Sequence, residues 1–156
     1  MSLSWDMPSH RLMRDTLANG GPDGTAFGTE ELRQAVARKW VEDMELYYDL
    51  LVGSTQSLDL WATEYLRVLE GQDAVLEWVQ ATGLRPFLNG FGDQERRNFL
   101  TEYARRLHQL YPARPGGHTL YPFRRLFIAA TVSLGAMSGH AGGAVPLIVR
   151  RSRNTP

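Results

Sequence analysis

The sequence holds few residue patterns that could carry chemistry. It has no cysteine, which excludes disulfides, cysteine-ligated metals and thiol catalysis. It has no phosphate loop of the G-x-x-x-x-G-K-[ST] type, and no G-x-G-x-x-G motif follows a predicted strand. The four histidines lack metal-ligand spacing, so we expect no metal site. Ser9 and His10 are neighbours on a predicted helix, where side chains point apart, so we expect no nucleophile and base pair.

A group of cations and aromatic residues near segment ends remains as a candidate site. Arginine and histidine suit carboxylate or phosphate binding, and aromatic rings can form the walls of a pocket. The group consists of His10, Arg14, Arg85, Arg124 and Arg125, with Trp61 and Tyr65. By spacing alone, residues of these types are more often solvated charges or packing aromatics than ligands.

The charge of the chain is zero overall but unevenly distributed. All 17 acidic residues lie at or before Glu102, together with 9 of the 17 basic residues, so this stretch carries −8 and the rest +8. Two segments of one fold could neutralise each other, or the basic part could face an anionic partner. The aromatics of the basic part resemble core residues, so we expect no nucleic-acid binding.

The first half of the chain predicts three helices. Ser9 is the candidate N-cap of the first, and Thr29 opens the second, which runs to about Trp40. A short third helix covers residues 42–51, with Gly53 as its C-terminal cap.

The second half mixes strands and helices. Alternation from Ser57 predicts a strand with one apolar face. A helix over 72–82 should end at Gly83, before a tight connection over 84–88. A long helix follows over 93–111, then a strand over 120–132 that is apolar on both faces. Residues 145–149 are a possible strand, which Pro146 excludes from the centre of a sheet.

Composition agrees with a globular protein. The chain has 156 residues, of which 43% are hydrophobic and 22% charged. Its longest apolar run is too short to span a bilayer, and its first residues lack a signal-peptide core. We therefore expect a soluble, cytoplasmic protein.

Several short segments of the sequence are similar to segments of trans-aconitate methyltransferases. The resemblance begins with Pro-Ser-His-x-x-Met-Arg and is strongest in Val-Leu-Glu-Trp-Val followed by Thr-Gly-Leu-Arg-Pro-Phe-Leu. It returns in Phe-Arg-Arg-Leu-Phe-Ile-Ala and covers about residues 5–131. These segments are residues 8–14, 75–79, 82–88 and 123–129.

The resemblance implies an α/β fold, the C-terminal half of a Rossmann-like, seven-stranded class I methyltransferase with a helical insertion between strands six and seven. Residues 1–132 would form this acceptor-substrate side of the domain, and 133–156 a flexible, Gly-rich and basic tail. The family uses S-adenosylmethionine, held by a Gly-rich turn and an acidic residue in its first half. This sequence contains neither, so we expect it to be inactive alone.

The reaction implied is transfer of a methyl group to a carboxylate of trans-aconitate or a similar small polycarboxylic acid. On this reading His10, Arg14 and Arg85 contact carboxylates, and Trp61 and Tyr65 form walls. Arg125 matches the family's arginine before Leu-Phe, whereas Arg124 departs from it. The alternative is a non-catalytic fragment or interaction module derived from such an enzyme. An exposed sheet edge also predicts self-association.

Overall fold

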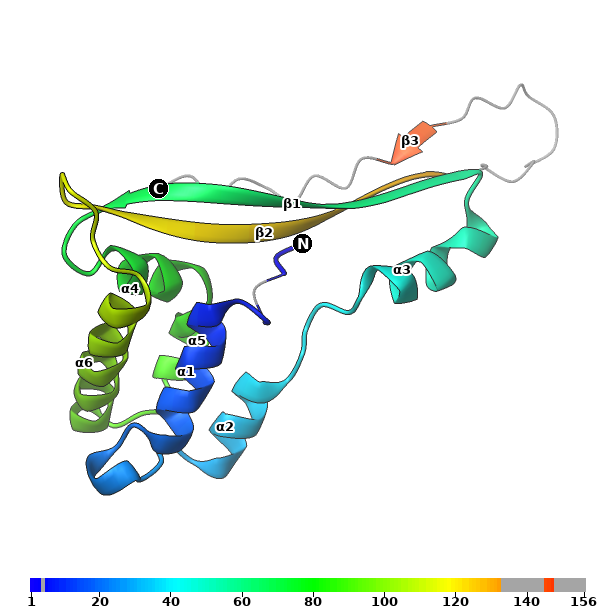
Figure 1. Cartoon of the computed structure of the whole chain (residues 1–156). Coiled ribbons are helices and arrows are strands. Elements are labelled where there is room, and N and C mark those ends of the chain that lie inside the picture. Colours follow the sequence, from blue (N-terminus) through cyan, green and yellow to red (C-terminus); the bar gives the residue numbers. More distant parts are fainter. Residues whose placement is uncertain (4, 133–144, 148–156) are drawn as a thin grey trace. The chain divides into compact units, whose positions relative to one another are not determined.

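The computed structural model describes residues 1–3, 5–132 and 145–147, with α-helices, strands and short 3₁₀ and π turns between them (Figure 1). These residues form two compact units. The helical unit comprises Leu3–Trp40 and Glu64–Phe123, and the strand unit comprises Met1–Ser2, Val41–Thr63 and the described part of Arg124–Pro156. The boundary falls inside strands β1 (Ser57–Glu70) and β2 (His118–Val132), which contribute residues to both units.

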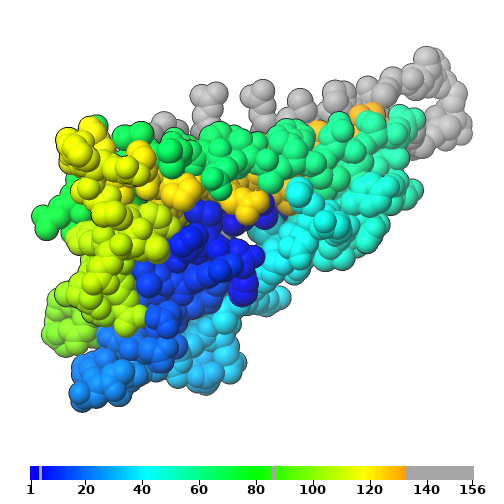
Figure 2. Space-filling view, in the orientation of Figure 1, coloured from blue at the N-terminus to red at the C-terminus, as the bar shows by residue number. Residues whose placement is uncertain are grey.

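Two long helices build the core of the helical unit. Helix α1 (Pro8–Asn19) lies beside α6 (Asp93–Leu110), as the blue and yellow-green surfaces of Figure 2 show. The buried residues of α6 are Phe99, Tyr103 and Leu107, four residues apart, so one face of the helix meets the core. The predicted long helix is confirmed, and these three residues form its buried stripe.

The beginnings of the first two helices divide the predictions. Helix α2 (Glu30–Ala37) begins after Thr29, so the predicted helix start is confirmed, and Oγ1 of Thr29 accepts a hydrogen bond from the Leu32 amide at 3.3 Å. Helix α1 instead begins two residues earlier than a Ser9 cap requires, with Met7 at its N-cap and Pro8 at its first position. The prediction of Ser9 as N-cap is therefore wrong. Ser9 lies within α1 and is fully buried.

The predicted break at Gly83 does not exist. Helix α4 (Ala74–Val79) continues through a π-helical turn, η3 (Gln80–Leu84), into α5 (Arg85–Leu88). The expected connection over 84–88 is helical, because Gly83 does not adopt the positive φ of a terminating glycine. The π turn absorbs the glycine inside a continuous helical segment.

The strand unit is built on a sheet in the order β1-β2-β3, with β3 (Val145–Leu147) antiparallel to β2. Thr131 lies opposite Pro146 in this pair, and the proline is tolerated in a short edge strand. Ser2 forms an isolated antiparallel bridge with Arg125. Helix α3 (Met44–Leu51) runs on into a 3₁₀ turn, η2 (Val52–Ser54), so the predicted cap at Gly53 is wrong.

Strand β2 differs from the expected fully buried strand. From Thr119 to Phe123 it alternates between buried and half-buried residues, and residues 127–132 are half-buried throughout. Trp78 of α4 packs against Tyr121 and Phe123 of β2, with ring centroids 6.4 Å and 6.0 Å apart. The described architecture is mixed α/β. Most of the predicted tail over 133–156 lies outside the described residues.

Candidate functional site

His10 and Arg14 lie one turn apart on the same face of α1. His10 is half-buried. Burial and, second, the positive charge of Arg14 lower the pKa of His10 to about 4. At neutral pH the imidazole is therefore uncharged, with one nitrogen that donates and one that accepts. A fixed cation beside a neutral donor is a combination that can hold an ionised carboxylate.

Ser9 is the centre of a buried hydrogen-bond cluster beside His10. Its Oγ lies 2.9 Å from the hydroxyl of Tyr121 and 3.3 Å from Nδ1 of His10. The hydroxyl of Tyr103 donates to the Ser9 carbonyl oxygen at 2.9 Å. Burial raises the pKa of Tyr121 to about 12, so its hydroxyl keeps its proton. The expectation that Ser9 and His10 point apart is wrong, because Nδ1 lies on the Ser9 side of the ring.

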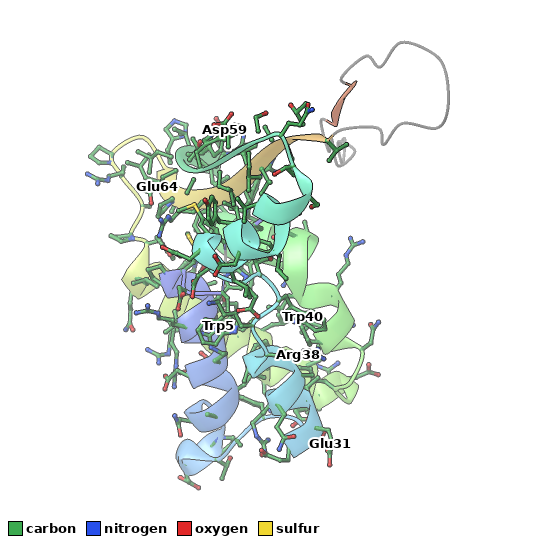
Figure 3. The ribbon with its side chains drawn as sticks, turned by 90° about the vertical axis from the view of Figure 1, so that its right-hand side faces the viewer. Trp5, Glu31, Arg38, Trp40, Asp59 and Glu64 are labelled. Atoms are coloured by element: carbon green, nitrogen blue, oxygen red, sulfur yellow. The ribbon has the colours of Figure 1, made fainter. Side chains whose placement is uncertain are left out.

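Arg14 is held by Trp5. Its Nη1 donates to the Trp5 carbonyl at 2.8 Å, and the guanidinium lies 4.1 Å from the centre of the Trp5 ring. Trp5, labelled in Figure 3, in turn donates from Nε1 to the carbonyl of Ala37 at the end of α2. Burial lowers the pKa of Arg14, with a smaller opposing effect of Asp6, but an arginine remains cationic at neutral pH.

The π turn meets His10 from a second element. A Cβ placed on Gly83 would lie 4.0 Å from Nε2 of His10, with no other heavy atom of the described residues that close outside its own helix and chain neighbours. Arg85 follows two residues later as the first residue of α5 and is exposed. π-helical turns are rare and frequently lie at functional sites.

The structure divides the predicted site residues between the two units. The helical unit contains His10, Arg14, Arg85 and Tyr65, which is 38% exposed on β1.

The strand unit contains Trp61 and Arg125. Trp61 stacks on Phe127 with centroids 5.3 Å apart and an angle of 11° between the rings, the cross-strand packing that is common for such residues. Arg125 is exposed, and its backbone pairs with Ser2. Only His10 and Arg14 are therefore shown together, and the roles of all six residues stay predictions.

Sequence reasoning missed the residues that surround His10. The sequence pattern indicates for Ser9 only a cap or a nucleophile, and for Gly83 only a helix end. Tyr103 and Tyr121 are aromatic residues at core positions, which no local pattern distinguishes from ordinary packing residues. A serine next to a histidine is the one local signal. Its partners lie 94 and 112 residues away.

The described residues contain neither a cluster of metal ligands nor a membrane-spanning helix. No group of three or more histidine, aspartate or glutamate side chains within the described ranges could hold a metal ion. None of the described helices is long and apolar enough to cross a membrane.

Comparison with known proteins relates the chain to trans-aconitate 2-methyltransferases. The enzyme of Pseudomonas aeruginosa (strain UCBPP-PA14) is 42% identical over 127 residues, which are 81% of this chain and 46% of that protein. The enzyme of Azoarcus sp. (strain BH72) is 38% identical over 131 residues, 83% of this chain and 48% of that protein. That of Rhizobium rhizogenes (strain K84) is 39% identical over 123 residues, 79% and 46% respectively. No protein-family model matches the chain. The chain thus spans just under half the length of these relatives.

Proposed function

We propose that this chain, related to trans-aconitate 2-methyltransferases over about half their length, is the acid-binding part of a methyltransferase. The enzyme would transfer a methyl group from S-adenosylmethionine to a carboxylate of trans-aconitate or a similar small polycarboxylic acid. The observation that carries the proposal is identity of about 40% across four fifths of the chain.

The described residues do not fit the cofactor. In α/β folds a glycine-rich turn from a strand into a helix receives such a ligand. The connection from β1 to α4 has a single glycine, Gly71, and a Cβ there would meet open space. No step of methyl transfer is therefore assigned to these residues, and the chain alone should be inactive.

What this chain can supply is a grip on the acid. A carboxylate is ionised at neutral pH, so it needs no general base to become a nucleophile. It needs orientation and partial removal from water, which raise the rate without proton transfer. Arg14 offers the charge and His10 a neutral donor on one face of α1, and Arg85 follows the adjacent π turn.

Titration of the 156-residue chain with trans-aconitate, followed by NMR, tests this proposal. We expect shifts at His10, Arg14 and Gly83, and weaker binding in Arg14→Gln. Arg11→Gln is the matched control, because Arg11 is exposed and pairs with Asp6 at 3.6 Å. If both substitutions weakened trans-aconitate binding equally, the effect would come from the overall charge of the protein and not from a contact of Arg14. Calorimetric titration with S-adenosylmethionine should give no binding, and micromolar affinity would contradict the assignment of the cofactor to another part of the enzyme.

The alternative, a non-catalytic interaction module, is supported by exposed apolar residues. Leu66 and Val68 on β1 are 62% and 61% exposed, and α3 has no buried residue. The two functions can be separated by mixing the chain with the part of the Pseudomonas aeruginosa relative that it does not match. A complex with methyl transfer supports the enzyme. A complex without transfer supports the interaction module.

A further inference from the structure

We infer that Tyr121 and Ser9 are positioning residues that hold His10 as its Nε2–H tautomer, so that this N–H donates to a carboxylate beside Gly83. The identity of the acid rests on the proposed function, whereas the tautomer follows from the hydrogen bonds around Ser9. The chain of contacts runs from β2 to α1 and ends opposite the π turn.

The acceptors available to Tyr121 and Ser9 determine which group donates in each hydrogen bond. The Tyr121 ring is buried, and Ser9 is the hydrogen-bond partner that the structure gives its hydroxyl. If Tyr121 accepted from Ser9, its own proton would be left without an acceptor among the described residues, which is costly in a buried site. Tyr121 therefore donates to Ser9 Oγ. The Ser9 proton is then free to donate to Nδ1 of His10, 3.3 Å away.

A further contact, outside the hydrogen bonds from Tyr121 to His10, holds the backbone of Ser9. The buried hydroxyl of Tyr103 donates to its carbonyl at 2.9 Å, which holds the first turn of α1 against α6. The ring of Tyr111 packs edge-on against Tyr121, with centroids 5.4 Å apart. The Tyr111 hydroxyl lies near Ser9 but has no hydrogen-bond partner of good geometry. The Ser9 backbone is thus held by Tyr103, and the Ser9 hydroxyl lies within hydrogen-bond distance of both Tyr121 and Nδ1 of His10.

Nε2 then carries the proton and is the ring nitrogen nearest to Gly83. Gly83 has no side chain, and a Cβ there would lie at contact distance from Nε2, 4.0 Å away, so Nε2 faces the π turn. Arg14, one turn along α1, supplies the charge that a carboxylate needs. A neutral donor next to a cation avoids a second buried positive charge.

The tautomer can be measured directly in the 156-residue chain. Two-bond ¹H–¹⁵N correlation NMR at pH 7 should show His10 protonated at Nε2 and unprotonated at Nδ1. The opposite tautomer, or an even mixture, overturns the inference whatever acid is bound. Tyr121→Phe should convert His10 to a mixture, and Ser9→Ala removes the same link if the phenylalanine variant fails to fold. Tyr111→Phe is the matched control, and it should leave the tautomer unchanged.

Titration with trans-aconitate tests the donor role. Tyr121→Phe should weaken binding roughly fivefold or more, the effect of about one hydrogen bond, whereas Tyr111→Phe should bind like the unaltered chain. Equal binding by both variants overturns the role of the relay. If the unaltered chain binds no trans-aconitate, the donor role and the proposed function both fail, although a fixed Nε2–H tautomer would still establish Ser9 and Tyr121 as positioning residues.

Discussion

Helices α6 and α3 both carry apolar residues at helical spacing, but only α6 buries them. Phe99 on α6 is 1% exposed and is stacked between Phe91 and Tyr103, whereas Leu50 on α3 is 67% exposed. The difference arises from what faces each helix. Helix α6 meets α1 within its own unit, while α3 has no buried residue. Apolar residues at helical spacing therefore indicate a helix face that is stabilised by burial. Whether that face is buried depends on residues of another segment that pack against it.

The largest expected effect comes from removing a ring of the α6 core. Phe99→Ala should reduce the free energy of unfolding by about 3–5 kcal/mol, because it leaves a cavity among aromatic neighbours. Leu50→Ala on α3 should change it by less than about 0.5 kcal/mol. Urea unfolding of both variants measures the two values. Comparable losses would break the comparison and mean that α3 is covered in solution.

The buried histidine makes the stability of the helical unit depend on pH. The folded pKa of His10, about 4, lies below the unfolded value of 6.5. Between these values the unfolded chain binds more protons, so stability should fall as pH decreases from about 6.5 to 4, by on the order of 2 kcal/mol. His10→Gln should flatten this part of the curve. Hydrogen exchange should locate the loss in α1 and α6, and an equal loss in α3 would contradict its origin at His10.

A smaller effect is expected at Glu102 on α6. Hydrogen bonds from Arg105 and Arg106 lower its pKa to about 2, and Arg106 also bonds Asp15 of α1 at 2.6 Å. The stabilisation is present above about pH 4.5 and is lost as pH falls toward 2. Because Arg105 is exposed and Glu102 is only half-buried, water screens these pairs, and Glu102→Gln should cost only about 0.5–1 kcal/mol. Asp49→Asn on α3 is the control, and an equal cost there would remove the distinction between the helices.

Two glycines in helical turns give the finest comparison. Gly83 and Gly53 lie in the π turn and the 3₁₀ turn, and neither has a positive φ. Alanine at either position should stabilise the fold by about 0.5 kcal/mol, because glycine loses more backbone entropy on folding. Only Gly83→Ala should also weaken trans-aconitate binding, since only its methyl would approach Nε2 of His10. Equal binding by both variants would exclude the space beside Gly83 as part of the site.

What could be predicted from the sequence depended on the range of the interactions. The long helix α6 and the start of α2 at Thr29 are local, because spacing or neighbouring side chains determine them, and both predictions are confirmed. The isolated bridge from Ser2 to Arg125 and the burial of Ser9 depend on residues more than 90 positions away. The prediction of a helix end at Gly83 is wrong because the usual role of glycine at helix ends is local, whereas its place in a π turn depends on the helix continuing beyond it.

The charge split is partly explained by the same contacts. Arg105 and Arg106 belong to the basic end of the chain, yet they pair with Glu102 and Asp15 from the acidic part. For these two arginines, the ion pairs support the hypothesis that basic and acidic segments of the fold neutralise each other. Arg150, Arg151 and Arg153 lie outside the described residues, so the reading of the tail stays a prediction.

The π turn also makes chain length a determinant of the site. A π turn closes its hydrogen bonds one residue later than an α-helix, so deleting one residue from 80–84 would restore α-helical pairing. Arg85 would then keep its place around the helix axis, because a π turn holds about one residue more per turn than an α-helix. The backbone that faces Nε2 of His10 at Gly83 would change instead. A one-residue deletion here would thus alter the surroundings of His10 without moving Arg85, which no point substitution reproduces.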